Sequence, residues 1–288
     1  FLLPLNRFKK EYKINNIDDD TSIDRLNKLI TPFILRRKKK DVLKDLPDKI
    51  ENNIIVELND EQKKLYLMQL EKTKEELDKL IKDGNVNKSS ILILSLLTKL
   101  RQICIDPRLL FENEIKSSKL DTLIEILNEV KKEHKILLFS QYPSALKLII
   151  PTLDENNITY YYLDGSTKSN KRVELVNKFN KDDTNIFLIS LKAGGTGLNL
   201  TSADVVIHLD PWWNPQVENQ ATDRSHRIGQ KKVVEVIKLI AKGTIEEKIV
   251  ELQNKKQKLS DKIIEGDNRD SINISKMDVE NLKELIGI

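Results

Sequence analysis

The chain has 288 residues, of which 33% are charged and 39% hydrophobic, and its net charge of +4 does not by itself indicate a nucleic-acid partner. No hydrophobic run reaches the roughly 18 residues of a membrane span, so we expect a soluble protein without a membrane partner. The single cysteine, Cys104, excludes an internal disulfide. The sequence also shows no signal peptide, and a single cysteine is typical of a reducing compartment. We therefore predict a cytoplasmic location.

Residues 1–47 differ in character from the rest of the chain. They contain an acidic stretch, a possible helix over residues 22–30 and five consecutive cations at Arg36–Lys40. We interpret them as a connector, in which the basic run docks onto a neighbouring part or touches anionic phosphates; a localisation-like basic patch and a solvated turn are the alternatives. Because the chain begins with Phe1 rather than methionine, we expect a fragment of a longer protein.

Residues 48–117 are predicted to form a helical module attached to a sheet domain. Apolar residues recur at helical spacing over residues 60–81 and 91–103, and the segment between these two helices, Gly84–Ser90, is rich in turn-forming residues. At the other end, residues 243–288 are predicted to form a long amphipathic helix, followed by a tail from Gly266.

Between these flanks, residues 118–242 alternate helices with short apolar runs that are rich in β-branched residues. Ser117 and Ser118 are possible caps of the first helix, and further helices are predicted at about 144–155 and 170–180. Apolar runs of this kind are typical of parallel strands that are covered on both faces, so we expect an α/β fold with a doubly wound parallel sheet. The predicted strands are 135–140, 159–163, 185–190, 204–210 and 233–240.

The chain lacks the sequence signals of a nucleotide hydrolase. None of its nine glycines is followed by lysine, so no GxxxxGK[ST] phosphate loop is present. Its two Asp-Glu dipeptides, Asp60-Glu61 and Asp154-Glu155, are not followed by the residues of a magnesium-holding helicase motif. The glycine-rich stretch KAGGTGLN at 192–199 follows a strand, and it is either a ligand loop or a tight turn.

Six spaced motifs together resemble the second lobe of a Swi/Snf-family ATPase, a helicase-like motor of superfamily two. They occur in that family's order and, with GTIEEKI at 243–249, cover nearly the whole chain from about residue 30. The motifs are LRRKKKDVLKDLPDK (35–49), LRQICIDPRLL (100–110), ILLFSQY (136–142), YLDGST (162–167), LISLKAGGTGLNLTSADVVIHLDPWWNP (188–215) and QATDRSHRIGQ (220–230).

The resemblance implies two RecA-like lobes, with ATP between them and double-stranded DNA running across both. ATP and Mg²⁺ are then held mainly by the first lobe, which is not in this chain, so the chain alone is expected to lack ATPase activity and to hold no tightly bound cofactor. The implied partners are double-stranded DNA and that first lobe, in a monomeric motor that remodels nucleoprotein, and the helix after residue 242 braces the two lobes. An Asn-, Lys- and Ile-rich composition suggests a bacterial source, hence association with the nucleoid.

The segment 220–230 supplies the candidate catalytic residues. If residues 215–225 are helical, then Gln220, Arg224 and Arg227 lie on one face. The resemblance makes Arg224 and Arg227 arginine fingers, and it places Gln220, Gly195, Gly197 and Asn199 on the nucleotide side. The alternative is that these arginines form ordinary surface ion pairs with Asp223.

The candidate DNA-binding residues follow the predicted strands, where open α/β sheets bind ligands. Trp212 and Trp213 are the only tryptophans, and because successive side chains point to opposite faces, we expect one to pack inward and Trp213 to face DNA, unless both belong to the core. By the resemblance, the DNA-binding set is Ser140, Gln141, Gly165, Ser166, Lys192 and Trp213. For all of these except Trp213, the alternative is a purely structural role in a turn.

Two other functions stay open. An RNA helicase lobe usually carries an HRxGRxxR-like motif, whereas this chain has DRSHRIGQ at 223–230. The second open function is a free-standing nucleic-acid-binding module without a catalytic partner. The three histidines and Cys104 have no spacing that indicates a metal site, so we expect none.

Overall fold

The computed structural model describes residues 46–82, 90–112, 115–194 and 197–263, together with Lys28 and Leu43. These residues belong to two units: one holds the described residues from Leu46 to Val250, and the other holds Lys28, Leu43 and the part of the last helix from Glu251 onward. The predicted helix over 22–30, the basic run Arg36–Lys40, most of the loop Gly84–Ser90 and the tail from Gly266 lie outside the described residues.

A six-stranded parallel sheet forms the centre of the first unit, with strand order β1-β6-β5-β2-β4-β3. All five predicted strands are present, each within two residues of its predicted start. The strands are β1 (Lys49–Val56), β2 (Ile136–Ser140), β3 (Tyr160–Leu163), β4 (Ile186–Ser190), β5 (Val205–His208) and β6 (Val234–Ala241).

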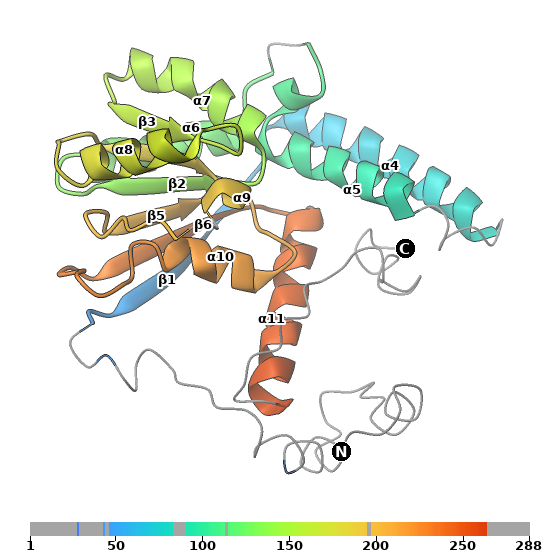
Figure 1. Ribbon diagram of the computed structural model, residues 1–288. Helices are drawn as coiled ribbons and strands as arrows, with labels where there is room; N and C mark the ends of the chain where they lie inside the picture. The colour runs from blue at the N-terminus through green and yellow to red at the C-terminus, as the bar shows by residue number, and fades with distance from the viewer. Residues whose placement is uncertain are drawn as a thin grey trace. The chain divides into compact units, whose positions relative to one another are not determined.

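Helices cover both faces of this sheet (Figure 1). Helices α6 (Ser118–Val130) and α7 (Pro143–Glu155) pack on one face, whereas α8 (Ser169–Phe179), α9 (Leu191–Gly194) and α10 (Pro215–Thr222) pack on the other. The doubly wound α/β architecture is therefore confirmed.

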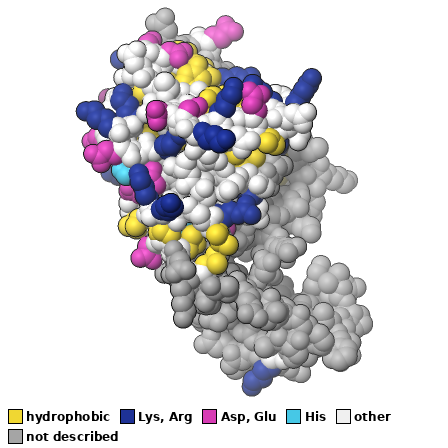
Figure 2. All heavy atoms as spheres, turned by 60° about the vertical axis from the view of Figure 1, so that its left-hand side comes forward, with side chains coloured by type: hydrophobic (Ala, Val, Ile, Leu, Met, Phe, Trp, Pro, Cys, Tyr) yellow, Lys and Arg dark blue, Asp and Glu magenta, His cyan; other side chains and the backbone are white. Residues whose placement is uncertain are grey.

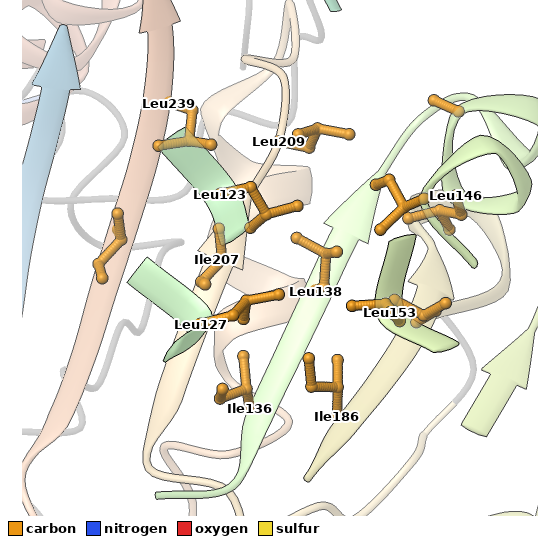
Figure 3. Packing of buried hydrophobic residues seen from close by; sticks show 14 of the residues in the cluster. Leu123, Leu127, Ile136, Leu138, Leu146, Leu153, Ile186, Ile207, Leu209 and Leu239 are labelled. Carbon is orange, nitrogen blue, oxygen red and sulfur yellow. The ribbon is translucent and has the colours of Figure 1, made fainter. Parts of the chain in front are cut away.

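Neighbouring residues of the central strands enter different cores because successive side chains of a strand point to opposite faces. On β2, Leu138 packs beneath α6 and α7, whereas Leu137 and Phe139 pack beneath the helices on the other face. Figure 3 shows Leu123 and Leu127 of α6 beside Leu138 and Ile207, in the same cluster. Burial of both faces explains why these strands are continuous apolar runs.

Strand β1 is a feature that the sequence pattern does not predict. Residues 48–117 are expected to be helical, yet Lys49–Val56 pairs with the whole length of β6. Its sequence, KIENNIIV, is largely exposed because it lies at the end of the strand order, with Ile50 51% and Ile55 49% exposed. The rest of the module is helical, with α4 (Asp60–Lys82), α5 (Ser90–Ile105) and a short 3₁₀ helix, Pro107–Leu109.

A buried ion pair connects the first helix of the sheet domain to the last. Ser117 caps α6 by accepting a hydrogen bond from the Leu120 amide at 3.1 Å, and this places Lys119 in the first turn, fully buried. Its Nζ lies 2.6 Å from Glu246 Oε2, at the start of α11 (Ile245–Ile263), and donates to the carbonyls of Leu209 and Leu239. Lys119 therefore holds α6, the ends of β5 and β6, and the start of α11 together.

His208, the last residue of β5, is buried beside α10. Its Nε2 lies 3.1 Å from the Thr222 hydroxyl, its ring stacks on Phe139, and Nδ1 has no hydrogen-bond partner among the described residues. Burial lowers the pKa of His208 to about 4, with Lys238 acting in the same direction and Glu218 opposing it. The imidazole is therefore neutral at pH 7.

Replacing Lys119 by methionine is expected to reduce the free energy of unfolding by about 3–5 kcal/mol, because the buried Glu246 carboxylate loses its partner. The double variant Lys119→Met/Glu246→Gln removes that unpaired charge and should recover part of the loss. Urea unfolding of the three proteins measures both effects. Equal losses in the single and double variants would show that the ion pair is not the cause.

Stability should also fall on mild acidification because of His208. Its folded-state pKa of about 4 lies below the ordinary 6.5, so the unfolded state takes up a proton first and stability is lost as the pH falls from about 6.5 towards 4. Between pH 7 and pH 5 this amounts to about 2 kcal/mol. His208→Gln keeps a partner for Thr222 without the titration, and urea unfolding at the two pH values should show a smaller decrease for it than for the wild type.

Candidate functional site

The carboxyl ends of the parallel strands form one edge of the sheet, and most of the predicted DNA-binding residues lie there. Ser140 ends β2 and Gln141 follows it, Gly165 and Ser166 follow β3, and Lys192 follows β4 in α9. Because all the strands are parallel, the structure brings these segments to the same edge. Gly165, Ser166 and Lys192 are exposed there.

The turn after β3 is organised by Asp164. Its Oδ1 accepts hydrogen bonds from the Ser166 amide at 2.9 Å and from the Ser166 hydroxyl at 2.6 Å, and the hydroxyl is the main cause that lowers the pKa of Asp164. A Cβ atom built on Gly165 meets nothing within 4 Å. The turn thus offers an open approach to its backbone, although its own hydrogen bonds also account for its shape.

Ser140 has a different position from the one predicted. It is fully buried, and its hydroxyl donates to Asp210 Oδ1 at 2.6 Å and accepts from the Tyr142 amide at 3.1 Å. A buried hydroxyl with both roles filled has no surface to offer DNA. The prediction that Ser140 contacts DNA is therefore corrected: it shapes the loop that carries Gln141.

Arg101 of α5 is the residue that the sequence reasoning missed. Its side chain is 2% exposed, yet it reaches both loops at this edge: Nη1 donates to Gln141 Oε1 at 2.9 Å, and Nη2 lies 3.4 Å from Asp210 Oδ2 and donates to the Pro211 carbonyl. Burial raises the pKa of Asp210, whereas the Arg101 guanidinium and the Ser140 hydroxyl lower it. The only signal in the sequence was the placement of Arg101 within the motif LRQICIDPRLL.

The two tryptophans lie around the same guanidinium. The centroids of the Trp212 and Trp213 rings lie 5.8 and 5.1 Å from Arg101 Cζ, and the Tyr142 ring is also 5.8 Å away. Trp213 is only 7% exposed, so the prediction that it faces DNA is corrected: it lies inward, and Trp212 is the more exposed of the two. The strand has already ended at His208, so strand alternation does not apply to them.

The arginine segment is also built differently from the prediction. Helix α10 ends at Thr222 with Asp223 as its cap, and tight turns follow, with the amide of Arg224 bonded to Ala221 O and that of Arg227 to Ser225 O. Helical spacing therefore does not place Gln220, Arg224 and Arg227 on one face. Gln220 and Arg227 are exposed, and Arg224 is partly buried.

The charges of the two arginines nevertheless interact. Burial lowers the pKa of Arg224, the nearby Arg227 guanidinium lowers it further, and Asp223 opposes both. Arg227 is exposed and Arg224 is partly buried, and positive charges on one short segment favour the approach of an anion. A phosphate group carries the type of charge that this arrangement suits.

The loop after α9 is attached to this segment. The Leu200 amide donates to the Arg224 carbonyl at 2.9 Å, and the Asn199 carbonyl accepts from the Asn180 side chain at 2.8 Å. Gly197 and Asn199 are exposed, and Gly197 has a φ of 49°, which favours glycine. The structure thus brings this part of the predicted nucleotide set close to Arg224, whereas Gly195 lies outside the described residues.

The arginine segment lies towards the amino ends of the strands, away from the DNA-binding candidates. His226 Nε2 lies 2.8 Å from the Pro47 carbonyl, just before β1, and Gln230 Nε2 donates at 2.8 Å to Ala203 O, just before β5. Figure 2 views the molecule from the side that lies to the left in Figure 1 and shows basic and acidic side chains interspersed there. The candidate residues therefore form two sets at opposite edges of the sheet.

Other kinds of site find no support in the part of the chain that the structure describes. No group of three or more His, Cys, Asp or Glu side chains there is arranged to hold a metal ion. No described helix is long and apolar enough to cross a membrane. The donors that the described residues offer to a nucleotide are guanidinium, amide and backbone groups, which fit its phosphates rather than its metal ion.

Two family models match this chain. The Helicase conserved C-terminal domain matches residues 118–229, which include both sets of candidate residues, and the SNF2-related domain matches residues 2–109. Among curated proteins, the chain is 45% identical over 253 residues to an uncharacterized ATP-dependent helicase of Mycoplasma pneumoniae, with 86% of this chain and 24% of that protein covered. The chain spans between 24% and 32% of the length of such curated relatives.

Solved structures give the same result. The chain is similar to the Sulfolobus solfataricus SWI2/SNF2 ATPase C-terminal domain, with 34% identity and a TM-score of 0.65 over 83% of this chain and 98% of that one. It is also similar to the Sulfolobus solfataricus SWI2/SNF2 ATPase core in complex with dsDNA, with 36% identity, a TM-score of 0.67, and 97% of this chain and 59% of that one covered. The predicted RecA-like fold is confirmed, and the chain belongs to the SWI2/SNF2 family of helicase-like ATPases and contains that family's C-terminal lobe.

Proposed function

We propose that this chain is the second motor lobe of an ATP-dependent translocase that moves along double-stranded DNA and remodels nucleoprotein. The observation that carries the proposal is the pair Arg224 and Arg227, whose charges act on each other in a chain that has no phosphate loop of its own. Such a pair fits a nucleotide that another part of the motor holds. The chain alone is therefore proposed to lack ATPase activity.

The arginines act as fingers in this proposal. A guanidinium stays charged and presents five donors in one plane, which suits the charge that develops on a transferring γ-phosphoryl group. Gln220, Gly197 and Asn199 are proposed to lie on the same approach to the nucleotide, and the resemblance adds Gly195 to this set. The first lobe is proposed to hold ATP and Mg²⁺, which neutralises phosphate charge, while this lobe supplies the arginines when the two lobes close.

The carboxyl edge is proposed to hold the DNA backbone. The Lys192 ammonium and the Gly165 amide are the proposed donors to phosphate oxygens, and Ser166, which donates to Asp164, shapes the turn that presents Gly165. Phosphate contacts carry no sequence code. A solved relative of the family is in complex with dsDNA, which supports a duplex over RNA. Contacts that ignore sequence are what a motor needs to step along DNA.

The loop between the two sets provides a physical connection between them. It starts at Lys192 in α9, on the DNA side, and its Leu200 amide is bonded to the Arg224 carbonyl, on the nucleotide side. Movement of the arginines as the lobes close is thereby passed to the residue that grips DNA. We propose in addition that α11 braces the two lobes and that the motor is a monomer in the cytoplasm, at the nucleoid if the source is bacterial.

Arg227→Ala, made in the complete gene product, is expected to lower the DNA-stimulated kcat by about 10³-fold, because a lost finger leaves transition-state charge unopposed. Steady-state ATPase assays with duplex DNA measure it. Arg108→Ala is the matched control, since Arg108 is also exposed but pairs with Asp106 within the helical module. A kcat for Arg227→Ala within about threefold of the wild type would exclude the finger role.

The same assay separates the alternative functions. Stimulation by RNA above that by duplex DNA would indicate an RNA helicase. Absence of ATPase activity in the complete gene product, with nucleic acid still bound, would indicate a free-standing binding module.

Lys192→Ala should weaken duplex DNA binding uniformly across sequences and reduce the slope of log affinity against log salt by about 0.9, the effect of one phosphate contact. Fluorescence anisotropy at several salt concentrations measures the slope. Lys171→Ala is the control, because Lys171 is an exposed lysine of α8 that pairs with Glu174. An unchanged slope for Lys192→Ala would remove this lysine from the DNA interface.

A further inference from the structure

Arg172 reaches back from α8 to the turn that follows β3. It lies in the first turn of the helix and is partly buried. Its Nε donates to the Thr167 carbonyl at 2.8 Å, and its Nη2 lies 3.2 Å from the Gly165 carbonyl and 3.3 Å from the Asp164 carbonyl. A planar guanidinium can serve several acceptors at once. One side chain therefore holds three carbonyl groups of a single short turn.

These contacts also fix the direction of the amide groups in the turn. In a planar trans peptide, the C=O of one residue and the N–H of the next point in opposite directions. Because the Asp164 carbonyl faces Arg172, the Gly165 N–H points away from the guanidinium. The Ser166 amide is bonded to the Asp164 carboxylate, whereas the Gly165 amide has no hydrogen-bond partner among the described residues.

The Gly165 amide is open to a ligand as large as DNA. Gly165 is exposed, and a Cβ atom built on it meets nothing within 4 Å, so that a ligand can approach the backbone closely. A cation on the carbonyl side of a peptide polarises it, which makes the N–H on the opposite side a better donor. A donor that is already oriented also loses little freedom on binding. Arg172 thus prepares this amide for an anionic acceptor.

We propose that Arg172 is a positioning residue of the DNA interface: it holds the carbonyl groups of the turn 164–167 inward, so that the Gly165 N–H faces outward and donates to a backbone phosphate oxygen. The inference rests on the proposed function, in which the Gly165 amide binds duplex DNA. The charge of Arg172 acts on the carbonyl groups of this turn and not on the phosphate. Helix α8 thereby contributes to the grip on DNA through a side chain behind the contact.

The first test is Arg172→Gln in the complete gene product, with duplex DNA binding measured by fluorescence anisotropy at several salt concentrations. Glutamine cannot hold three carbonyl groups, so we expect the affinity to fall by about tenfold, the effect of losing one hydrogen bond to a charged group. The slope of log affinity against log salt should stay at the wild-type value, because a backbone amide neutralises no phosphate charge. Lys171→Gln is the matched control, since it removes one positive charge from the neighbouring position of α8, where Lys171 is exposed and pairs with Glu174. It should keep the wild-type affinity and slope.

Gly165→Ala tests the amide itself. The fold should tolerate this change because the added methyl group meets nothing within 4 Å, yet the methyl group stands beside the amide and obstructs a phosphate. We expect duplex affinity to fall by about tenfold here as well, with an unchanged thermal midpoint. Because Arg172 and Gly165 act through one contact, the double variant Arg172→Gln/Gly165→Ala should lose less than the two single effects combined. Where Arg172→Gln does not fold, the affinity of Gly165→Ala decides the outcome.

Wild-type DNA affinity in a folded Arg172→Gln or in Gly165→Ala overturns the inference, even where the thermal midpoint falls, because a merely structural arginine would give that result. A salt slope that is reduced by about 0.9 in Arg172→Gln overturns it equally, since this is the loss of one direct phosphate contact. Failure of the proposed function looks different, because the wild type would then not bind duplex DNA, and both proposals would fall.

Discussion

Two buried cations at the carboxyl edge of the sheet hold the rest of the domain in place. Parallel strands all end at the same edge, so their last carbonyl groups gather there and need donors. Lys119 donates to the carbonyls of Leu209 and Leu239, and Arg101 to that of Pro211. Each cation also faces a buried carboxylate, Glu246 or Asp210, and neither charge would be tolerated there without that partner.

This arrangement explains how parts distant in sequence act as one body. Lys119 fixes the start of α11 against the sheet, and Arg101 fixes the helical module to the loops that follow β2 and β5. The exposed candidates Gly165, Ser166 and Lys192 lie at the same edge. If these residues bind the DNA backbone as proposed, they must keep fixed distances from one another, and the buried ion pairs at this edge favour such an arrangement.

The separation of the two candidate sets is equally important for a motor. The arginine segment lies towards the amino ends of the strands and the DNA-binding candidates at the carboxyl ends, and the chain from Lys192 to Leu200 connects them. In the proposed motor, this loop and the hydrogen bond from the Leu200 amide to the Arg224 carbonyl connect the nucleotide side to the DNA side.

Much of the fold could be predicted because its signals are local. Continuous apolar runs such as ILLFS predict strands that are buried on both faces, and the caps and periodicity of α6 predict that helix. Strand β1 could not be predicted, since an edge strand with exposed Asn and Glu lacks such a run. Helix α10 is shorter than expected because tight turns after Thr222 replace helical hydrogen bonds, and helical spacing therefore misplaced Arg224 and Arg227.

By itself, the sequence determined the alternation of strands and helices, the family motifs and the lack of a phosphate loop, because these depend on the order of residues along the chain. Only the tertiary structure decided the burial of Ser140 and Trp213 and the partners of Lys119 and Arg101. These depend on contacts between residues far apart in the chain, such as Arg101 and Asp210, or Lys119 and Glu246. The order of residues along the chain does not indicate which buried charged side chains will pair with each other.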